Sequence, residues 1–551
     1  MSKDLVSVAN NYQASKIELW EGKKILFSSS GVGGDLGLQI QTLGIQQLLG
    51  YVRSKQHLVL VGKNESCTIF NQGHQYKVCV DRTDIEQWNI FLPMYTPLVL
   101  ADVSLEKTTE PDLVEEPLKE VQKKSQFGSR FAKKFGVQDS YVAGAMAGGI
   151  ASVDLVRAMS KHGRLAFFGA GGVPNSSVRT ALESLSTLDT PFGCNVLCNV
   201  QQPQQEEELI DILLEQRVQL ISASAYSTLT PALVRYRLKG ISESSDGSIV
   251  IPNQVFAKVS HPSVAKLFVS PPPQKIVDYL YNEGKISSKE AELASKISMA
   301  DALTVEADSG GHTDNRPLSV ILPSIKRLVR QSSFSLFVGA AGGLGTPESM
   351  ASAAILGADY LVLGSIHQSC VEAGTSDLVK QMLCRAKITD TDMGVAPDMF
   401  ERGSKVQVLT SGSLYAARSR KLRELYVRYS AVEDIPQSEQ KKISRLIFRD
   451  SLENIWKETE AYWNTTDPKQ LDRARRVPKH KLALLFRWYL GQSSRWARMG
   501  VVERKQDFQI WCGPAMGAFN EWATDNGFSS AEKRLIAPIS DALWNQFISL
   551  L

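Results

Sequence analysis

The sequence predicts an α/β fold: a closed (β/α)8 TIM barrel, preceded by an N-terminal α+β segment and followed by a helical C-terminal region. Three observations predict it. Short apolar runs alternate with segments of helical period between residues 135 and 387, eight such units follow one another, and the alternation then stops. Eight units in one unbroken series favour a closed barrel over an open doubly wound sheet.

The eight barrel strands are expected where apolar runs are bounded by turn residues. They lie at 141–145, 164–169, 191–197, 218–224, 249–259, 302–307, 334–340 and 360–365. Residues 272–299 have helical period and interrupt the series after the fifth unit. We therefore expect a helical insertion there.

Three further segments flank the barrel. Residues 1–105 contain alternating runs such as HLVLVG and TIFNQGHQYKVCV and predict an α+β segment. Residues 106–134 are rich in Lys and Glu and are broken by proline, as expected of a linker. Residues 388–551 carry seven of the nine Trp and apolar residues at helical spacing. We expect this last region to be helical and to cover the substrate site.

Composition limits the classes of function. The net charge is only +4, which does not suggest a nucleic-acid partner. The seven cysteines follow no disulfide pattern, which indicates a reducing compartment. Neither a signal peptide nor an apolar run of about 18 residues is present, so we predict a cytoplasmic protein without a membrane partner.

The active site of such a barrel lies at the carboxyl ends of its strands, and the unusual residues of the chain cluster there. The first strand runs into GAMAGGI, residues 144–150, whose small residues allow a flat ligand to approach the backbone. The next strands end near Asn195, at Ser222 to Ser224 and at Lys258. The sixth strand runs directly into EADSGGHTDNRP, residues 306–317.

GAAGGLGTPES, residues 339–349, is the strongest signal for a ligand. Gly342, Gly343 and Gly345 permit tight turns whose N–H groups can converge on phosphate oxygens, and Thr346 then begins a helix whose dipole favours an anion. GSIHQ, residues 364–368, supplies a second set of N–H groups. The loops after strands seven and eight commonly hold phosphate in such barrels. The alternative is that these glycines only make tight turns.

His312 follows two glycines at the end of a buried strand, with Asp308, Asp314 and Arg316 beside it. This setting favours a catalytic imidazole that acts as acid, base or hydrogen-bond donor. Metal-ligand spacings, the phosphate-binding GxxxxGK[ST] pattern and the GxSxG element of serine hydrolases do not occur in the sequence. We therefore predict no metal site.

From GGHTDNRP outward the sequence resembles the PfaD-type family of flavin-dependent enoyl reductases, which are related to nitronate monooxygenases. The resemblance covers roughly residues 130–545. It rests on YVAGAMAGGIAS, FGCNVL, SASAYSTLTPALVRYRLKG, AKVS, VEADSGGHTDNRP, GAAGGLGTPES, GSIHQSCVEAGTSD, APDMFERGSKVQVL, FRWYLGQSSRWA and QIWCGPAMGAFNEW. It implies a trans-acting enoyl reductase of polyketide or polyunsaturated fatty-acid synthases.

The resemblance implies that FMN lies over the barrel mouth. Its ring would contact Ala145 and Met146, with Asn195 and Lys258 near its polar edge. Its phosphate would rest on the two loops after strands seven and eight, and Ser224 and the glycines before His312 would complete the site. These further binding residues are Ser224, Gly310, Gly311, Gly342, Gly343, Gly345, Gly364 and Ser365.

In the implied reaction NADPH reduces the flavin, which passes hydride to the β-carbon of an α,β-unsaturated thioester. His312 would stabilise the enolate or protonate the α-carbon. Lys258 would place positive charge near the flavin and stabilise its reduced anion, although a salt bridge at the barrel rim is an alternative. The family's usual Asn in its GSxNQ segment is His367 here, so contacts around the phosphate or the ring differ.

The implied partner is an acyl carrier protein with its phosphopantetheine arm. Two basic clusters are candidates for docking it, although a solvated helix face explains either one. The Trp-rich segment from Trp488 to Trp522 is a candidate lining for the acyl channel, with core packing as its alternative. The sequence leaves self-association as a homodimer open. The clusters are Arg418, Arg420, Lys421 and Arg423, and Arg473, Arg475 and Arg476.

Two other functions compete with this prediction. The same flavin barrel can oxidise small nitronates, although such substrates need no large helical cover. The chain can also serve as a non-catalytic docking protein of an assembly line, although its intact glycines and His312 argue against that.

Overall fold

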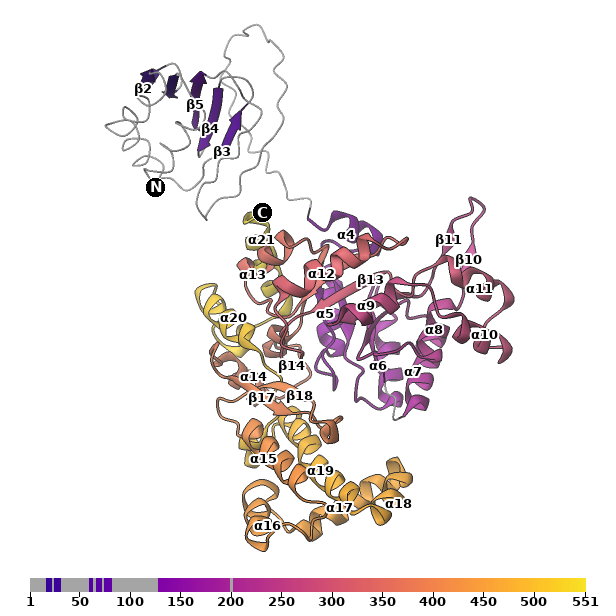
Figure 1. Ribbon diagram of the computed structural model, residues 1–551. Helices are drawn as coiled ribbons and strands as arrows, with labels where there is room; N and C mark the ends of the chain where they lie inside the picture. The colour runs from indigo at the N-terminus through magenta and orange to yellow at the C-terminus, as the bar shows by residue number, and fades with distance from the viewer. Residues whose placement is uncertain are drawn as a thin grey trace. The chain divides into compact units, whose positions relative to one another are not determined.

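The computed structural model describes residues 127–198 and 202–551 and five strands nearer the N-terminus (Figure 1). The chain splits into two compact units, residues 1–120 and 121–551. The first contains an antiparallel sheet in the order β2-β1-β5-β4-β3. Its strands are β1 (Lys16–Glu21), β2 (Lys24–Ser30), β3 (Val59–Gly62), β4 (Ser66–Asn71) and β5 (His74–Asp81).

In this unit β3, β4 and β5 fall in the alternating segments from which strands were predicted. A helix predicted within residues 1–105, and positions 106–126 of the predicted linker, lie outside the described residues. The domain boundaries therefore stay predictions.

The second unit contains the predicted closed barrel of eight parallel strands. Each predicted strand overlaps one barrel strand, so the fold class is confirmed. The order around the barrel is β12-β13-β15-β16-β6-β7-β8-β9. The strands are β6 (Tyr141–Ala143), β7 (Leu165–Phe168), β8 (Gly193–Leu197), β9 (Leu220–Ser224), β12 (Gln254–Val259), β13 (Ala302–Glu306), β15 (Phe337–Ala341) and β16 (Tyr360–Leu363).

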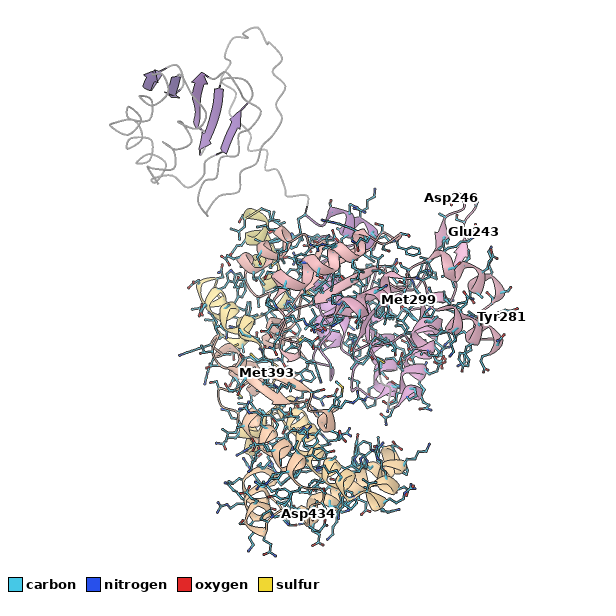
Figure 2. All side chains as sticks on the ribbon, viewed as in Figure 1. Glu243, Asp246, Tyr281, Met299, Met393 and Asp434 are labelled. Carbon is cyan, nitrogen blue, oxygen red and sulfur yellow. The ribbon has the colours of Figure 1, made fainter. Side chains whose placement is uncertain are left out.

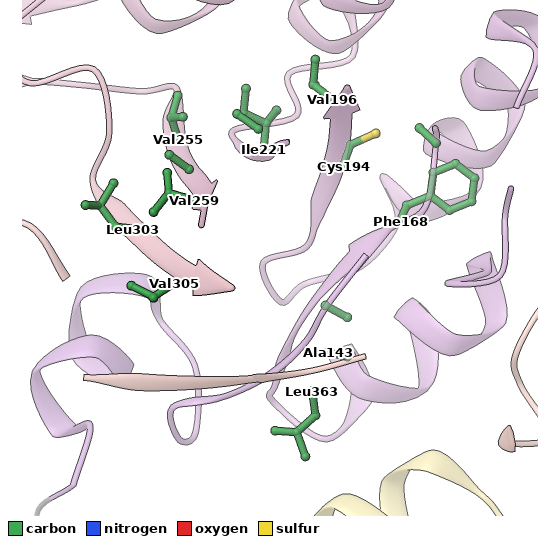
Figure 3. Packing of buried hydrophobic residues seen from close by; sticks show 14 of the residues in the cluster. Ala143, Phe168, Cys194, Val196, Ile221, Val255, Val259, Leu303, Val305 and Leu363 are labelled. Carbon is green, nitrogen blue, oxygen red and sulfur yellow. The ribbon is translucent and has the colours of Figure 1, made fainter. Parts of the chain in front are cut away.

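Side chains along each strand alternate between the barrel interior and the surrounding helices. Outward residues such as Val196, Ile221 and Leu303 belong to the main hydrophobic core (Figure 3). The inward Phe256 and Tyr360 belong to a separate cluster inside the barrel. Burial on both faces explains why the strands read as continuous apolar runs.

Aromatic side chains fill the amino-terminal end of the barrel. Helix α4 (Ser129–Phe135) brings the ring of Phe131 onto that of Tyr360, with the centroids 4.6 Å apart. On β15, a Cβ at Gly339 would lie 2.4 Å from the Tyr360 ring, so glycine is required there. The helix overlaps the last residues of the predicted linker, 106–134. Its apolar residues are interspersed with charged ones there, so the sequence pattern does not indicate a buried helix. Only the carboxyl ends of the strands are left for a ligand.

Seven helices follow their strands in the usual barrel order, but the eighth position is filled from the C-terminus. Helix α21 packs between α13 and α5, next to strands β16 and β6. The last helix of the chain therefore closes the barrel. The helices in order are α5 (Val153–Lys161), α6 (Asn175–Leu185), α7 (Pro203–Glu215), α8 (Pro231–Leu238), α9 (Pro262–Val269), α12 (Leu318–Arg330), α13 (Pro347–Ile355) and α21 (Ile536–Ser549).

Two smaller features lie at the side of the barrel. The predicted insertion forms α10 (Gln274–Asn282) and α11 (Ser288–Leu293), with Tyr281 exposed at its outer edge (Figure 2). The predicted strand 249–259 is divided in two. Its first part, β11 (Ile249–Val250), pairs with β10 (Ser242–Glu243) in a hairpin. Pro252 lies in the break, and proline cannot donate to a strand ladder.

The C-terminal region is helical, as predicted, but it also contains a small sheet that the sequence analysis missed. Its strands β17 (Thr391–Val395) and β18 (Lys405–Leu409) pair with the two-residue β14 (Gly311–His312) from the loop after β13. The sheet lies between the barrel and the helices beyond it (Figure 1). Those helices are α15 (Tyr415–Arg428), α16 (Gln437–Ile443), α17 (Leu452–Thr466), α18 (Pro468–Arg476) and α19 (Pro478–Met499).

These helices have a second hydrophobic core, centred on residues such as Tyr415, Phe486 and Tyr489. Figure 2 shows Met393, on β17, near the barrel and Asp434, after α15, at the far end of the region. Helices α14 (Asp377–Cys384) and α20 (Pro514–Asp525) connect the region to the barrel. None of the helices within the described residues is long and apolar enough to cross a membrane.

Candidate functional site

The carboxyl ends of β8 and β9 place three polar side chains inside the barrel, because the aromatic positions of the interior give way to Asn and Ser there. The Asn195 amide donates to the Ser222 carbonyl oxygen (3.2 Å) and to Ser224 Oγ (3.4 Å). Ala225 follows with a φ of 62°, a left-handed conformation that non-glycine residues rarely adopt. Such strain often marks a binding site. The structure thus brings the predicted Asn195 and Ser224 together.

Lys258, on β12, points to the same mouth, where its Nζ lies 2.7 Å from Oε1 of Glu306 on β13. Ser309 Oγ donates to the same carboxylate oxygen at 3.2 Å. The salt bridge that the sequence analysis held as an alternative is therefore present. The predicted effect of Lys258 on a flavin stays a proposal, and its positive charge is compensated in this structure.

Ala145 and Met146 lie half-buried beyond the end of β6. The Met146 carbonyl oxygen accepts from the N–H of Ala151 at 3.1 Å, which folds the loop back. A Cβ at Gly169, after β7, would lie only 1.8 Å from that oxygen, so the neighbouring strand end must be glycine. The loop after β6 is therefore packed closely against the end of β7.

The glycines after β15 and β16 fall into two groups. A Cβ at Gly343 or Gly364 would meet no atom within 4 Å, and among the described residues the N–H groups of Gly343, Gly364 and Ser365 have no protein acceptor. By contrast, a Cβ at Gly342 would lie 2.7 Å from the Ala307 carbonyl oxygen, and one at Gly345 2.6 Å from that of Ala515. The first group can hold an anion, whereas the second keeps adjacent chains in close contact.

Helix α13 begins with a capping box. Thr346 Oγ1 accepts from the Ser349 N–H at 3.3 Å, and Ser349 Oγ accepts from the N–H groups of Gly345 and Thr346, each at 3.0 Å. These N–H groups are therefore already used. Of the predicted phosphate-binding glycines, Gly345 has a structural role, whereas Gly343 and Gly364 keep their donors for a ligand.

The two glycines before His312 are packed against the C-terminal region. A Cβ at Gly310 would lie 2.9 Å from the backbone N of Cys512, and Gly311, at a φ of 87°, approaches the Trp511 ring. Pairing of β14 with β18 sets Gly311 opposite Gln407. These contacts explain both glycines without a cofactor, so their predicted role in binding rests on the sequence alone.

His312 hydrogen-bonds a residue that the sequence analysis did not identify. Its Nε2 lies 3.0 Å from Oδ1 of Asp398, in the loop between β17 and β18. Burial raises the pKa of Asp398, but the hydrogen bond and the charge of His312 outweigh it and bring the pKa below its ordinary value. A carboxylate only accepts hydrogen bonds, so Nε2 must carry the proton. Nδ1 is then the ring atom left for chemistry.

The charged neighbours of His312 in sequence have other partners. Asp308 accepts from Asn315 Nδ2 (2.8 Å) and Gln407 Nε2 (3.3 Å). Asp314 accepts from Ser260 Oγ at 2.6 Å, and Arg316 donates to the Ser260 carbonyl oxygen. These bonds tie the loop to the end of β12 and to β18. The acids near His312 in the sequence thus position the loop rather than the imidazole.

His367 lies outside the candidate site. It is fully buried, and its Nε2 is 2.7 Å from the Tyr141 hydroxyl, on the outer face of β6. Burial lowers its pKa to about 3, so the imidazole is neutral. The Arg164 guanidinium lies 5.4 Å from the Tyr141 ring centroid. His367 therefore belongs to the core between the barrel strands and the surrounding helices.

The Trp-rich segment, predicted as a channel lining, is largely committed to packing. Trp496 and Trp511 pack against both hydrophobic cores, and Trp488 against the second. Trp522 donates from Nε1 to Gln546 at 2.8 Å. These contacts support the packing alternative.

Two family models match the chain. The model for nitronate monooxygenase matches residues 129–443. A model for the inserted helical domain of [acyl-carrier-protein] S-malonyltransferase matches residues 429–508, which include α16 to α19.

Three of the similar curated proteins are named for polyunsaturated fatty acid synthase or polyketide biosynthesis. The chain is 42% identical to a polyunsaturated fatty acid synthase subunit of Thraustochytrium over 404 residues, 71% of this chain and 27% of that protein. It is 40% identical to polyketide biosynthesis protein ThaF of Burkholderia thailandensis over 430 residues, 76% and 37% of the two chains. It is 37% identical to polyketide biosynthesis protein PksE of Bacillus subtilis over 470 residues, 84% and 60%. The chain thus spans only 27% to 60% of these relatives.

A solved structure is similar over nearly its whole length. It is the enoyl reductase domain of MlnA from the macrolactin biosynthesis cluster of Bacillus amyloliquefaciens, which superposes with a TM-score of 0.74. The two sequences are 35% identical, and the match covers 77% of this chain and 98% of that domain.

Proposed function

Because the chain belongs to the nitronate monooxygenase family, we propose that it is an FMN-dependent enoyl reductase, which uses NADPH to saturate the α,β-double bond of thioesters on acyl carrier proteins. The observation that carries the proposal is the 35% identity to an enoyl reductase domain, 98% of which is covered. The polyketide and polyunsaturated fatty-acid synthase relatives support such substrates. The match of residues 429–508 to a helical domain of a carrier-protein transferase supports a carrier partner.

The residues at the barrel mouth fit a flavin mononucleotide. Gly343 and Gly364 leave space beside N–H groups that have no protein acceptor, which suits phosphate oxygens. Ala145 and Met146 would lie against the ring, and the Asn195 amide near its polar edge. When bound, FMN would supply the hydride chemistry between NADPH and the substrate's β-carbon, and these residues would hold it.

His312 would act at the carbonyl end of the substrate. With Nε2–H donated to Asp398, Nδ1 is the ring nitrogen left to meet the substrate. An imidazolium N–H at that position can stabilise the enolate oxygen that develops when hydride adds to the β-carbon. The same proton can then pass to the α-carbon. Asp398 is a positioning residue in this scheme, since it acts through His312.

Lys258 and Glu306 form an ion pair at the carboxyl ends of β12 and β13. In this structure the ion pair compensates the charge of Lys258, and the glutamate also accepts from Ser309. Lys258 would supply positive charge near the polar edge of a bound flavin. Glu306 would be its partner when no other anion is near, and this is the role we propose for the pair.

The competing activity is oxidation of nitronates, after which the matching family model is named. Two assays on one FMN-containing preparation separate the functions. The first follows NADPH oxidation with crotonyl thioester without oxygen, and the second follows oxygen uptake with ethylnitronate. We expect turnover in the first assay and only background in the second. The reverse result would assign the chain to nitronate oxidation.

A further inference from the structure

A groove on the C-terminal region begins one residue from the partner of His312. It has a volume of about 370 Å³. Its wall combines the turn after Asp398, the end of α15, and the junction of α18 with α19. The lining residues are Met399, Glu401, Arg402, Tyr426, Arg473, Val477, Lys479 and His480.

Some charged side chains of this groove have a partner within the chain, and others do not. The carboxylate of Glu401 is held by Arg487 at 3.3 Å. The Lys479 ammonium donates to the carbonyl oxygens of Tyr426 and, at 2.5 Å, Tyr429, which end α15. Arg402 and Arg473 remain exposed, and within residues 127–198 and 202–551 neither has a carboxylate within 4.0 Å. The groove therefore presents two guanidinium groups whose charge nothing in the described chain compensates.

The other titratable groups do not oppose these charges. His480 is buried and hydrogen-bonds Gln470 at 2.9 Å. Burial, followed by the charge of Arg473, lowers its pKa, so it is neutral near pH 7. Burial and the charge of Glu401 raise the pKa of Tyr426, which is also neutral. The groove is thus net positive.

Apart from Arg473, the basic residues of the two predicted docking clusters do not present an uncompensated charge in the groove. Arg423 donates to the Glu401 carbonyl oxygen and lies over the Tyr426 ring, while Arg476 donates to the Asp472 carbonyl oxygen and does not line the groove. The others are paired with carboxylates. These pairs are Arg418 with Asp507, Arg420 with Asp392, Lys421 with Glu439, and Arg475 with Asp472. Of the seven residues, only Arg473 offers an uncompensated charge inside a groove.

The groove also exposes apolar surface. Met399 is 37% exposed and Val477 is 42% exposed. Met399 directly follows Asp398, whose carboxylate holds His312. A ligand bound at the two arginines can therefore extend along Met399 toward the imidazole. The groove thus combines two uncompensated guanidinium groups with apolar side chains that lie toward His312. This combination fits an anionic molecule with a flexible, weakly polar arm.

We infer that this groove is the docking site of the carrier protein. Arg402 and Arg473 bind the phosphodiester at the root of the phosphopantetheine arm and the acidic side chains around it, and Met399 and Val477 contact the arm. Guanidinium groups suit phosphate because they donate two parallel hydrogen bonds. The inference rests on the proposed function, since it supplies the route by which a carrier-bound thioester reaches His312.

Charge reversal tests it. The variants are Arg402→Glu and Arg473→Glu, with Arg475→Glu as the matched control, because Arg475 lies on the same helix but outside the groove. Each is assayed with crotonyl thioester on a phosphopantetheinylated carrier protein and with crotonyl pantetheine, which lacks protein and phosphate. The groove variants should raise KM for the carrier substrate by about tenfold or more. Their kcat, their KM for crotonyl pantetheine, and all constants of Arg475→Glu should stay within about twofold.

Direct binding separates this inference from the proposed reaction. Fluorescence anisotropy of labelled crotonyl carrier protein should show tight binding to the wild-type protein and to Arg475→Glu, and weaker binding to both groove variants. Equal binding by all four proteins, or no binding by the wild type, overturns the assignment. A rise in KM for NADPH alone also overturns it and assigns the arginines to the nucleotide. Carrier binding without reduction of crotonyl thioester would instead overturn the proposed function and leave the docking site in place.

Discussion

The Nε2 atom of His312 lies 3.0 Å from Oδ1 of Asp398, a residue 86 positions further along the chain. The pairing of β14 with β18 brings the two loops together. The imidazole that we propose as catalytic is thus oriented by a carboxylate from the C-terminal region. That region consequently contributes a residue to the proposed site.

His312→Ala should lower kcat for crotonyl thioester by about 100-fold, as expected when a general acid is lost, while FMN content and KM change little. Asp398→Asn should lower kcat by about tenfold, because the imidazolium loses its charged partner. The double variant should be no slower than His312→Ala, since residues that act as one unit are not additive. Steady-state kinetics of the four proteins give the cycle. Asp314→Asn, which affects only the contacts of Asp314 with Ser260 and Arg316, should match the wild type.

Gly364→Asp should abolish the yellow colour of the purified protein. The glycine has a φ of −127°, which other residues adopt, and an added Cβ would meet no protein atom, so the fold should tolerate the change. A carboxylate there would repel the flavin phosphate and raise the Kd for FMN by about 100-fold or more. Gly247→Asp, in the β10–β11 hairpin, adds the same charge in open space and should leave the Kd unchanged. If Gly364→Asp bound FMN with wild-type affinity, the assignment of the phosphate to this loop would be wrong.

His367 should make the protein lose stability in mild acid. Its folded pKa is about 3, below the unfolded value of 6.5. The unfolded chain therefore binds a proton as the pH falls below 6.5, and the folded chain does not. The contribution of neutral His367 to the free energy of unfolding is complete above pH 6.5 and is lost progressively toward pH 3. Between pH 7.5 and pH 5.5 the loss is about 1.4 kcal/mol.

His367→Asn removes the titrating group and restores the residue usual in the family. Urea unfolding at the two pH values should therefore show a smaller acid-induced loss for the variant than for the wild type. Identical losses would mean that other groups account for the acid sensitivity.

Removal of residues 536–551 should prevent the barrel from folding, because α21 fills the position between α13 and α5.

Arg164 fixes helix α21. Its guanidinium is buried, lies 2.8 Å from Asp139, and reaches Asp541 on α21 at 2.7 Å. Arg164→Ala should cost about 3 kcal/mol, because it leaves the buried Asp139 carboxylate without its charged partner and with only the Tyr141 N–H as a donor. Circular dichroism and thermal unfolding measure both effects, and a cooperative transition in the truncated chain would contradict this role of α21.

The barrel could be predicted because its strands are buried on both faces. Each strand therefore appears in the sequence as one mainly apolar run, such as ALTVE or YLVL. Asn195 and Ser224 could be predicted for a related reason. A polar residue that ends such a run is expensive to bury without a function or a partner. The structure shows the partner, since the Asn195 amide donates to Ser224 Oγ.

The contacts between distant segments could not be predicted. Asp398 and Glu306 were missed as partners of His312 and Lys258, because pairings across strands and loops depend on the fold rather than on local spacing. β17 and β18 were missed because each has only five residues and is partly exposed. Nothing local marks α21 as the eighth barrel helix, since its place is set by topology. The one sequence signal for Asp398 is its place in APDMFERG, a segment that contributes to the family resemblance.

Product analysis tests the central claim most directly. The FMN-loaded protein is mixed with NADPH and a crotonyl-loaded carrier protein under nitrogen, and the acyl group is then analysed by mass spectrometry. We predict a gain of two hydrogen atoms by the acyl group, with one NADPH consumed per butyryl group formed. An unchanged crotonyl group in the presence of bound FMN, at carrier concentrations that saturate binding, would contradict the assignment as an enoyl reductase.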